Sequence, residues 1–109
     1  MAEPTIAEFM SGMQKAFIPE KAAGLDVAIQ IKFSGDDPSE WVMLIKNQTC
    51  TIQKGTAQGA KLTLSINSGD FMKLFTGKMD PMQAYMQGKI RVAGDINLAL
   101  KLMNLFKFQ

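Results

Sequence analysis

Alternation of apolar and polar residues predicts a β-sheet in the first two thirds of the chain. In residues 25–33 every second side chain is apolar, from Leu25 to Phe33, and the residues between them are polar or small. A period of two residues is typical of a strand with one buried and one exposed face. Residues 41–46 are largely apolar at both parities, which predicts a strand covered on each side. Further strands are expected at 49–54, 62–66 and 90–92.

Helical spacing of apolar residues appears at both ends of the chain. Thr5 and Glu8 have the spacing of a capping box, and the residues that follow predict an amphipathic helix to about Phe17. Two short helices, each ended by a glycine, are expected within 68–88, and a last helix is expected from Asp95 to the end. We therefore predict an α+β fold in which a five-stranded, mostly antiparallel sheet is covered on one face by helices.

The segment around Cys50 predicts a hairpin and a buried thiol. Asn47 and Gln48 stand between two predicted strands as a two-residue turn, although the second position lacks the usual glycine. Cys50 and Ile52 then share one face of the strand. A small apolar role in the core therefore fits Cys50 better than a role as a nucleophile.

The predicted last helix is unusually apolar. At 100° per residue its apolar side chains spread over an arc of roughly 220°, and only Asn97, Lys101 and Asn104 form a polar stripe. A surface helix needs about half of that apolar width. Two interpretations stay open: the helix lies deep in the core, or part of the arc faces a cavity that holds something apolar.

Composition limits the classes of function. The 109 residues, 47% of them hydrophobic and 20% charged, fit one domain over 1–109. Histidine is absent, so no Ser-His-Asp triad, Cys-His pair or histidine-ligated zinc site can form. We expect no enzymatic activity, no catalytic residue, no metal site and no cofactor. The net charge of +2 is too small to predict a nucleic-acid partner.

Charge is distributed unevenly along the chain. Residues 70–109 carry six basic and three acidic side chains, whereas residues 1–69 carry six basic and seven acidic ones. The basic segment is either a solvated face or a surface for a carboxylate, a phosphate headgroup or an anionic membrane. The sequence shows no secretion signal and no peroxisomal tripeptide at its end, so a cytoplasmic location is expected.

Methionines also gather in the second half of the sequence. Five of the nine lie between residues 72 and 103. Methionine is flexible and polarizable, so it suits an irregular apolar space whose contents vary. The methionines, the wide apolar arc and the apolar short helices together predict a hydrophobic tunnel between the sheet and the helices.

Three stretches resemble a known family. Residues 74–81 (Leu-Phe-Thr-Gly-Lys-Met-Asp-Pro), 84–90 (Ala-Tyr-Met-Gln-Gly-Lys-Ile) and 98–105 are similar to the carboxy-terminal signature of the sterol carrier protein 2 family, and Trp41 also matches its pattern. The resemblance implies a lipid tunnel between a five-stranded sheet and helices on one face. It also implies binding of fatty acids, fatty acyl-CoA esters, sterols or phospholipids without catalysis.

The resemblance also implies which residues contact the lipid. Tyr85 and Met86 stand where the family usually has phenylalanines, and Gln87 would offer a polar contact at the tunnel mouth. The apolar face of the last helix would line the wall. The complete set of predicted lipid-binding residues is Phe33, Trp41, Phe71, Leu74, Phe75, Met82, Tyr85, Met86, Gln87, Leu98, Leu102, Met103, Leu105 and Phe106.

The predicted function is therefore non-enzymatic binding and intracellular transfer of lipids, with transient contact with an anionic membrane surface. Two alternatives remain. The first is an accessory subunit that presents an isoprenoid or acyl substrate to a lipid-metabolising enzyme. The second is an interaction module with a filled core and no ligand.

Overall fold

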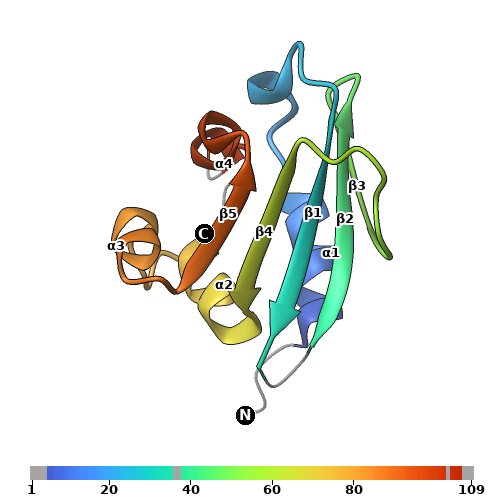
Figure 1. Ribbon diagram of the computed structural model, residues 1–109. Helices are drawn as coiled ribbons and strands as arrows, with labels where there is room; N and C mark the ends of the chain where they lie inside the picture. Colours follow the sequence, from blue (N-terminus) through green and yellow to red (C-terminus); the bar gives the residue numbers. More distant parts are fainter. Residues whose placement is uncertain (1–4, 36–37, 103, 107–109) are drawn as a thin grey trace.

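Ten helices and strands make up the described part of the chain. The computed structural model describes residues 5–35, 38–102 and 104–106. In chain order the elements are α1 (Ile6–Ala16), the 3-10 turn η1 (Pro19–Ala22), β1 (Val27–Ser34), β2 (Ser39–Lys46), β3 (Thr49–Lys54), β4 (Leu62–Asn67), α2 (Ser68–Phe75), α3 (Pro81–Met86), β5 (Ile90–Gly94) and α4 (Ile96–Leu102) (Figure 1).

The five strands form a single sheet in the order β3-β2-β1-β4-β5. Strand pairs are antiparallel except for the central pair, in which β1 and β4 run parallel. The predicted α+β fold with a mostly antiparallel, five-stranded sheet is confirmed. The parallel central pair was not predicted, because alternation within a strand carries no information about the direction of its neighbour.

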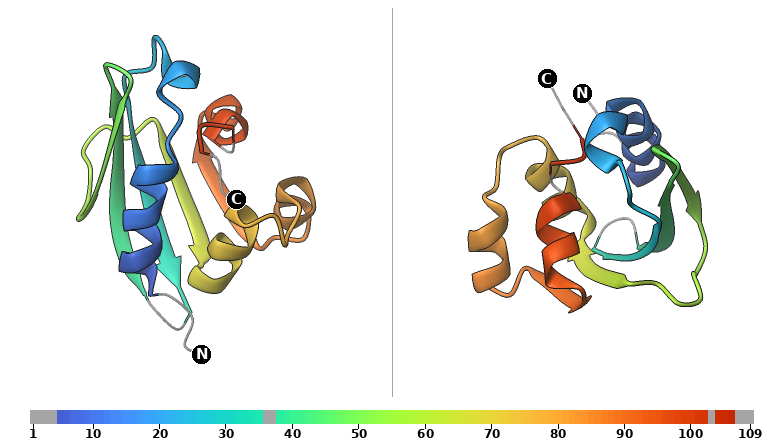
Figure 2. Two further views of the ribbon diagram at one scale, coloured as in Figure 1. Left: turned by 180° about the vertical axis from the view of Figure 1, so that it is seen from behind. Right: turned by 90° about the horizontal axis from the view of Figure 1, so that it is seen from above.

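All four α-helices lie on the same face of the sheet, its inner face, as predicted (Figures 1 and 2). Helix α1 packs near β3 at one side of the sheet, whereas α2, α3 and α4 pack against β4 and β5 at the other. None of the helices in the described ranges is long and apolar enough to cross a membrane.

The strand register aligns inward side chains in rows across the sheet. Met43, Ile29 and Leu62 lie side by side in one row, and Ile31 pairs with Leu64 in the next. All five side chains are buried. Burial of apolar rows against the helices is the main favourable contribution to stability, at roughly 25 cal/mol per Å² of apolar surface.

Two polar residues are also buried, Ser68 at the start of α2 and Gln30 on the outer face of the sheet. The Gln30 side chain is 5% exposed. Its Nε2 donates to the carbonyl oxygens of Trp41 and Gly55, and its Oε1 accepts from the backbone N of Ala57 at 2.7 Å. These bonds satisfy the amide and hold the loop after β3 against the sheet.

The β2–β3 hairpin has the predicted two-residue turn. Asn47 and Gln48 both adopt positive φ, 52° and 60°, which is the backbone of a type I′ turn. The register pairs Cys50 with Ile45, so the thiol faces inward on the same side as Ile52, as predicted. Cys50 is half-buried, and desolvation raises its pKa to about 12.

We predict that Cys50 reacts slowly with a thiol reagent in the native protein. With a pKa of about 12, roughly one thiol in ten thousand is ionised at pH 8, and the thiolate is the reactive form. Labelling with 5,5′-dithiobis(2-nitrobenzoate) should therefore be slow in buffer and fast in urea. Equal rates in the two conditions would contradict the inward orientation.

The predicted helix from Asp95 to the end is wrong in its length. Helix α4 ends at Leu102, and Phe106 instead forms an antiparallel bridge with Phe17. The backbone N of Ile18 donates to the carbonyl oxygen of Leu105 at 2.7 Å. Because the chain leaves the helix after Leu102, Leu105 and Phe106 can enter the core, where both are buried. The stability gained by this tertiary packing exceeds what a few more helical residues would contribute.

Candidate functional site

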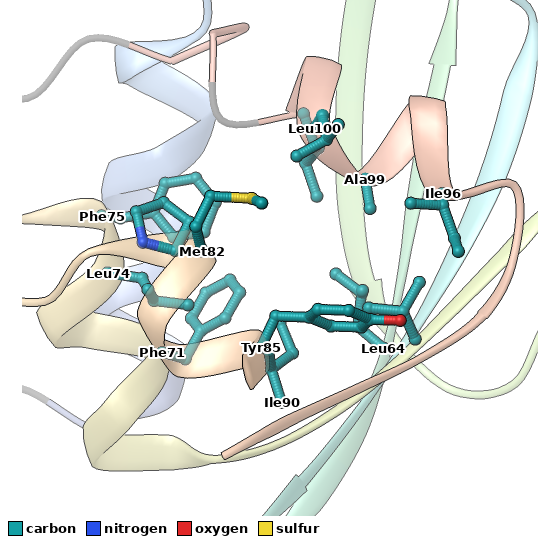
Figure 3. Close-up of a pocket in the computed structure, with 13 residues that line it drawn as sticks. Leu64, Phe71, Leu74, Phe75, Met82, Tyr85, Ile90, Ile96, Ala99 and Leu100 are labelled. Carbon is teal, nitrogen blue, oxygen red and sulfur yellow. The ribbon is translucent and has the colours of Figure 1, made fainter. Parts of the chain in front are cut away.

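A cavity of about 130 Å³ lies between α3, α4 and the inner face of β4 and β5 (Figure 3). Among the described residues that line it, every side chain is apolar except that of Tyr85, which has a hydroxyl. The lining residues come from β4 (Leu64), α2 (Phe71, Leu74, Phe75), α3 (Pro81, Met82, Tyr85), β5 (Ile90, Val92) and α4 (Ile96, Ala99, Leu100, Leu102).

Hydrogen-bonded caps fix the starts of α3 and α4, the two helices that form opposite walls of this cavity. Oδ2 of Asp80 accepts from the backbone N of Gln83 at 3.0 Å, and Pro81 occupies the first position of α3. Oδ1 of Asp95 accepts from the backbone N of Leu98 at 3.2 Å at the start of α4. Each cap fixes where its helix begins and therefore which side chains face the sheet.

The cavity opens between α3 and α4. On the α3 side, Met82 and Tyr85 are 53% and 46% exposed, and on the α4 side Ile96 and Leu100 are 50% and 49% exposed. Figure 3 shows the two pairs across the opening from each other, with Ala99 between Ile96 and Leu100. Partly exposed apolar side chains that also line the cavity mark its mouth.

Phe71 connects the cavity wall to the rest of the core. Its side chain is 1% exposed and lines the cavity. Its ring centroid lies 4.8 Å from that of Phe75, 4.9 Å from Phe33 and 5.9 Å from Phe9 on α1. The last two rings pack edge to face with Phe71, a favourable arrangement for aromatic pairs.

The structure brings together six of the predicted lipid-binding residues and separates the others. Around the cavity lie Phe71, Leu74, Phe75, Met82, Tyr85 and Leu102. Buried in the core outside its lining are Phe33, Trp41, Leu98, Leu105 and Phe106. Outside the lining and exposed are Met86 and Gln87. Met103 lies outside the described residues. A role in lipid contact stays a prediction for each of them.

Seven lining residues are missing from the predicted lipid-binding set, although the apolar arc of the last helix includes the last three of them: Leu64, Pro81, Ile90, Val92, Ile96, Ala99 and Leu100. Alternation had placed Ile90 and Val92 on one face of a strand, but it could not show that this face meets a cavity. Ile96 and Leu100 belong to the wide apolar arc and are one helical turn apart. The excess width of that arc was the signal for them.

The site holds none of the groups that a metal centre would need. Within 5–35, 38–102 and 104–106, no three His, Cys, Asp or Glu side chains are placed to hold a metal ion. The site is instead an apolar pocket whose described lining includes one side-chain hydroxyl, that of Tyr85, which suits a hydrocarbon chain with a polar end.

A family model matches most of the sequence. The model described as the SCP-2 sterol transfer family matches residues 13–107. The chain belongs to this family.

Two curated relatives are longer proteins than this chain. Hydroxysteroid dehydrogenase-like protein 2 of Xenopus laevis is 34% identical over 98 residues, which are 89% of this chain and 24% of that protein. Sterol carrier protein 2 of Homo sapiens is 37% identical over 71 residues, 65% of this chain and 13% of that protein. The chain thus spans about a quarter or less of each of these relatives.

A solved structure of similar length shares the fold. The solution structure of palmitated SCP2L2 from Aedes aegypti superposes with a TM-score of 0.74 at 21% identity, and the match covers 100% of this chain and 97% of that one. At this identity the likeness concerns the arrangement of strands and helices.

Proposed function

We propose that this chain binds the hydrocarbon part of a lipid in the cavity between α3 and α4 and carries the lipid without changing it chemically. The main support for this proposal is the cavity itself, which opens between α3 and α4 and whose described lining side chains are apolar except for the Tyr85 hydroxyl. Each methylene that leaves water for such a space contributes about 0.8 kcal/mol. Membership of the SCP-2 sterol transfer family supports the same ligand class.

The ligand would enter with its hydrocarbon end first. The Tyr85 side chain is 46% exposed, has the only hydroxyl among the described lining residues, and would meet the polar end. Fatty acids, fatty acyl-CoA esters, sterols and phospholipids all have this division into apolar body and polar end. The palmitated relative supports fatty acids in particular.

A long acyl chain needs more room than the cavity offers as it stands. An apolar cavity of roughly 150 Å³ takes a molecule the size of benzene, and this one measures about 130 Å³. Helix α3 buries only Ala84 among its six residues. Because so little apolar surface holds it, we expect α3 to move outward and extend the cavity when a long chain binds.

Affinity should rise with chain length until the cavity is filled. We predict about a fourfold gain per methylene, from about 0.8 kcal/mol each. Displacement of a fluorescent fatty acid by unlabelled fatty acids of increasing length measures this series. A series without saturable binding, or with equal affinities throughout, would contradict the proposal.

A second candidate is an accessory role, in which the domain presents a lipid to an enzyme. Two curated relatives favour this role, because the chain matches only 24% and 13% of their lengths and the rest of each protein could hold an enzyme. One of the two is named hydroxysteroid dehydrogenase-like protein 2. Transfer of a fluorescent fatty acid between vesicles by the isolated chain would favour the carrier. Binding without transfer, with delivery only to an enzyme added to the assay, would favour the accessory role.

A further inference from the structure

A second hollow, a polar groove, lies on the outer face of the sheet, the face opposite the helices (Figures 1 and 2). Its volume is about 370 Å³, and it lies where β1 and β4 end and β5 begins. Neighbouring residues of a strand point to opposite faces, so the residues beside the inward Phe33, Ile66 and Ile90 point outward. We call four of these outward residues, all of which line the groove, the basic array: Lys32, Ser65, Lys89 and Arg91.

The strand register places a hydroxyl between cations. Ser65 on β4 pairs with Lys32 on one side and with Arg91 on the other. Adjacent strands lie about 4.8 Å apart, so the two cationic residues are separated by roughly 10 Å across the sheet. Lys89 is two residues before Arg91 and shares its face. All three cations have long side chains that can reach one anion bound over Ser65.

The charges of the basic array are largely uncompensated. Within 5–35, 38–102 and 104–106, the side chains of Lys32, Lys89 and Arg91 have no hydrogen-bond or ion-pair partner, and all three are exposed. Glu40 pairs with Lys32 from β2, but it does not line the groove. The two aspartates at 36–37 lie outside the described residues. Three positive charges around one groove favour an anion there.

The positive charge is confined to one end of the outer face. The next outward row of the sheet is uncharged and consists of Val42, Gln30, Thr63 and Ala93. On the β2 side the array meets the negative charge of Glu40. A nucleic acid needs a longer track of cations along its backbone. The array therefore suits a single, compact anionic group.

The groove also lacks the apolar side chains that would anchor it in a bilayer. Within the described part of the chain, every exposed large apolar side chain lies on α3 or α4, and none of them lines the groove. Lysine and arginine side chains without apolar neighbours bind an anion from water as well as one on a surface. A water-soluble ligand is therefore favoured over a lipid headgroup.

We propose that the basic array binds the phosphate group of a small, water-soluble phosphate ester, at a site separate from the lipid cavity. A phosphate dianion has three terminal oxygens that accept strong, charge-assisted hydrogen bonds. The planar guanidinium of Arg91 matches two of these oxygens, and the lysine ammonium groups and the Ser65 hydroxyl can bond the remaining lone pairs. A carboxylate, with one charge and two oxygens, would use fewer of these donors.

Titration of the ¹⁵N-labelled chain with glycerol phosphate, followed by NMR chemical shifts, tests the site with matched variants. Arg91→Gln and Lys32→Gln should each weaken binding about tenfold, since each removes a charge-assisted hydrogen bond. Lys15→Gln removes the same charge from an exposed position on α1, on the other face of the sheet, and should bind as the unchanged protein does. Ser65→Ala should weaken binding without any change in net charge.

The charge of the ligand gives a second measurement. A phosphate monoester has a second pKa of about 6, so its dianionic fraction rises about fourfold between pH 5.5 and 7.5. The chain has no histidine, the side chain whose ordinary pKa falls in this range. Affinity for glycerol phosphate should therefore rise about fourfold, whereas affinity for inorganic sulfate, a dianion throughout, should stay constant.

Three results would overturn this site. The first is equal weakening by Arg91→Gln and Lys15→Gln, which would show that net charge alone attracts the ligand. The second is a titration without saturable shifts at Ser65 and its neighbours. The third is binding to vesicles that contain phosphatidic acid but not to glycerol phosphate, which would favour a lipid headgroup. Fatty-acid displacement, measured separately, should be the same for Arg91→Gln and the unchanged protein, because Arg91 lies outside the cavity lining.

Discussion

Replacing Ala99 by tryptophan should weaken the binding of long-chain fatty acids roughly a hundredfold while the fold remains stable. Ala99 is half-buried on α4 and lines the cavity, near Ile96 and Leu100 (Figure 3). An indole ring there would occupy the space of about four methylenes, and their exclusion costs about 3 kcal/mol, or roughly a hundredfold in affinity. The free energy of unfolding should change by less than about 1 kcal/mol, because the ring enters space that is empty.

Ala93→Trp is the matched control for this substitution. Ala93 is exposed on β5, next to Val92, which lines the cavity. Neighbouring residues of a strand point to opposite faces, so a tryptophan at 93 stays outside. Fatty-acid displacement and urea unfolding would be measured for both variants. Normal binding by a folded Ala99→Trp protein would show that the lipid lies elsewhere.

Truncation of Phe71 to alanine should lower the free energy of unfolding by about 3–5 kcal/mol. Phe71 is 1% exposed and contacts the rings of Phe9, Phe33 and Phe75, so its removal leaves a cavity among three aromatic neighbours. Such a loss is a large part of the 5–15 kcal/mol typical of a domain. Urea unfolding followed by the fluorescence of Trp41, the one tryptophan of the chain, would measure it.

Tyr85→Ala is the comparison for Phe71→Ala, because Tyr85 is another aromatic residue that lines the same cavity. Tyr85 is 46% exposed, so much less apolar surface returns to water on its removal. We expect a loss below about 1.5 kcal/mol, consistent with a side chain that is buried on one side only. If the two truncations cost the same, the ring cluster around Phe71 is not a main source of stability.

Local rules predicted the elements well. The capping box at Thr5 and Glu8 is present with both hydrogen bonds, and the turn at Asn47 and Gln48 has the expected backbone. Each depends on residues within three positions of one another, so the sequence alone contains the needed information. The inward orientation of Cys50 follows from the same turn, because turn length fixes the strand register.

The site was harder to predict because a pocket depends on which elements meet. An apolar periodicity cannot distinguish Leu98, which is buried outside the cavity lining, from Leu102 one turn later, which lines it. Likewise, Phe33 and Leu64 are both inward residues of central strands, yet only Leu64 reaches the cavity. Whether a buried side chain lines the cavity depends on how the helices pack on the sheet, and the local sequence pattern contains no information about that packing.

The parallel pairing of β1 with β4 sets the order in which parts of the molecule can fold. The antiparallel strands β1, β2 and β3 are close in sequence and can pair through short loops, whereas β4 must return past that whole unit to reach β1. Long-range pairing of this kind carries the larger loop-closure entropy and is slow. Every residue that lines the cavity lies at or beyond Leu64. We therefore expect refolding to pause at a stage when β1 to β3 are paired and the cavity's apolar side chains are still exposed, which is when aggregation competes with folding.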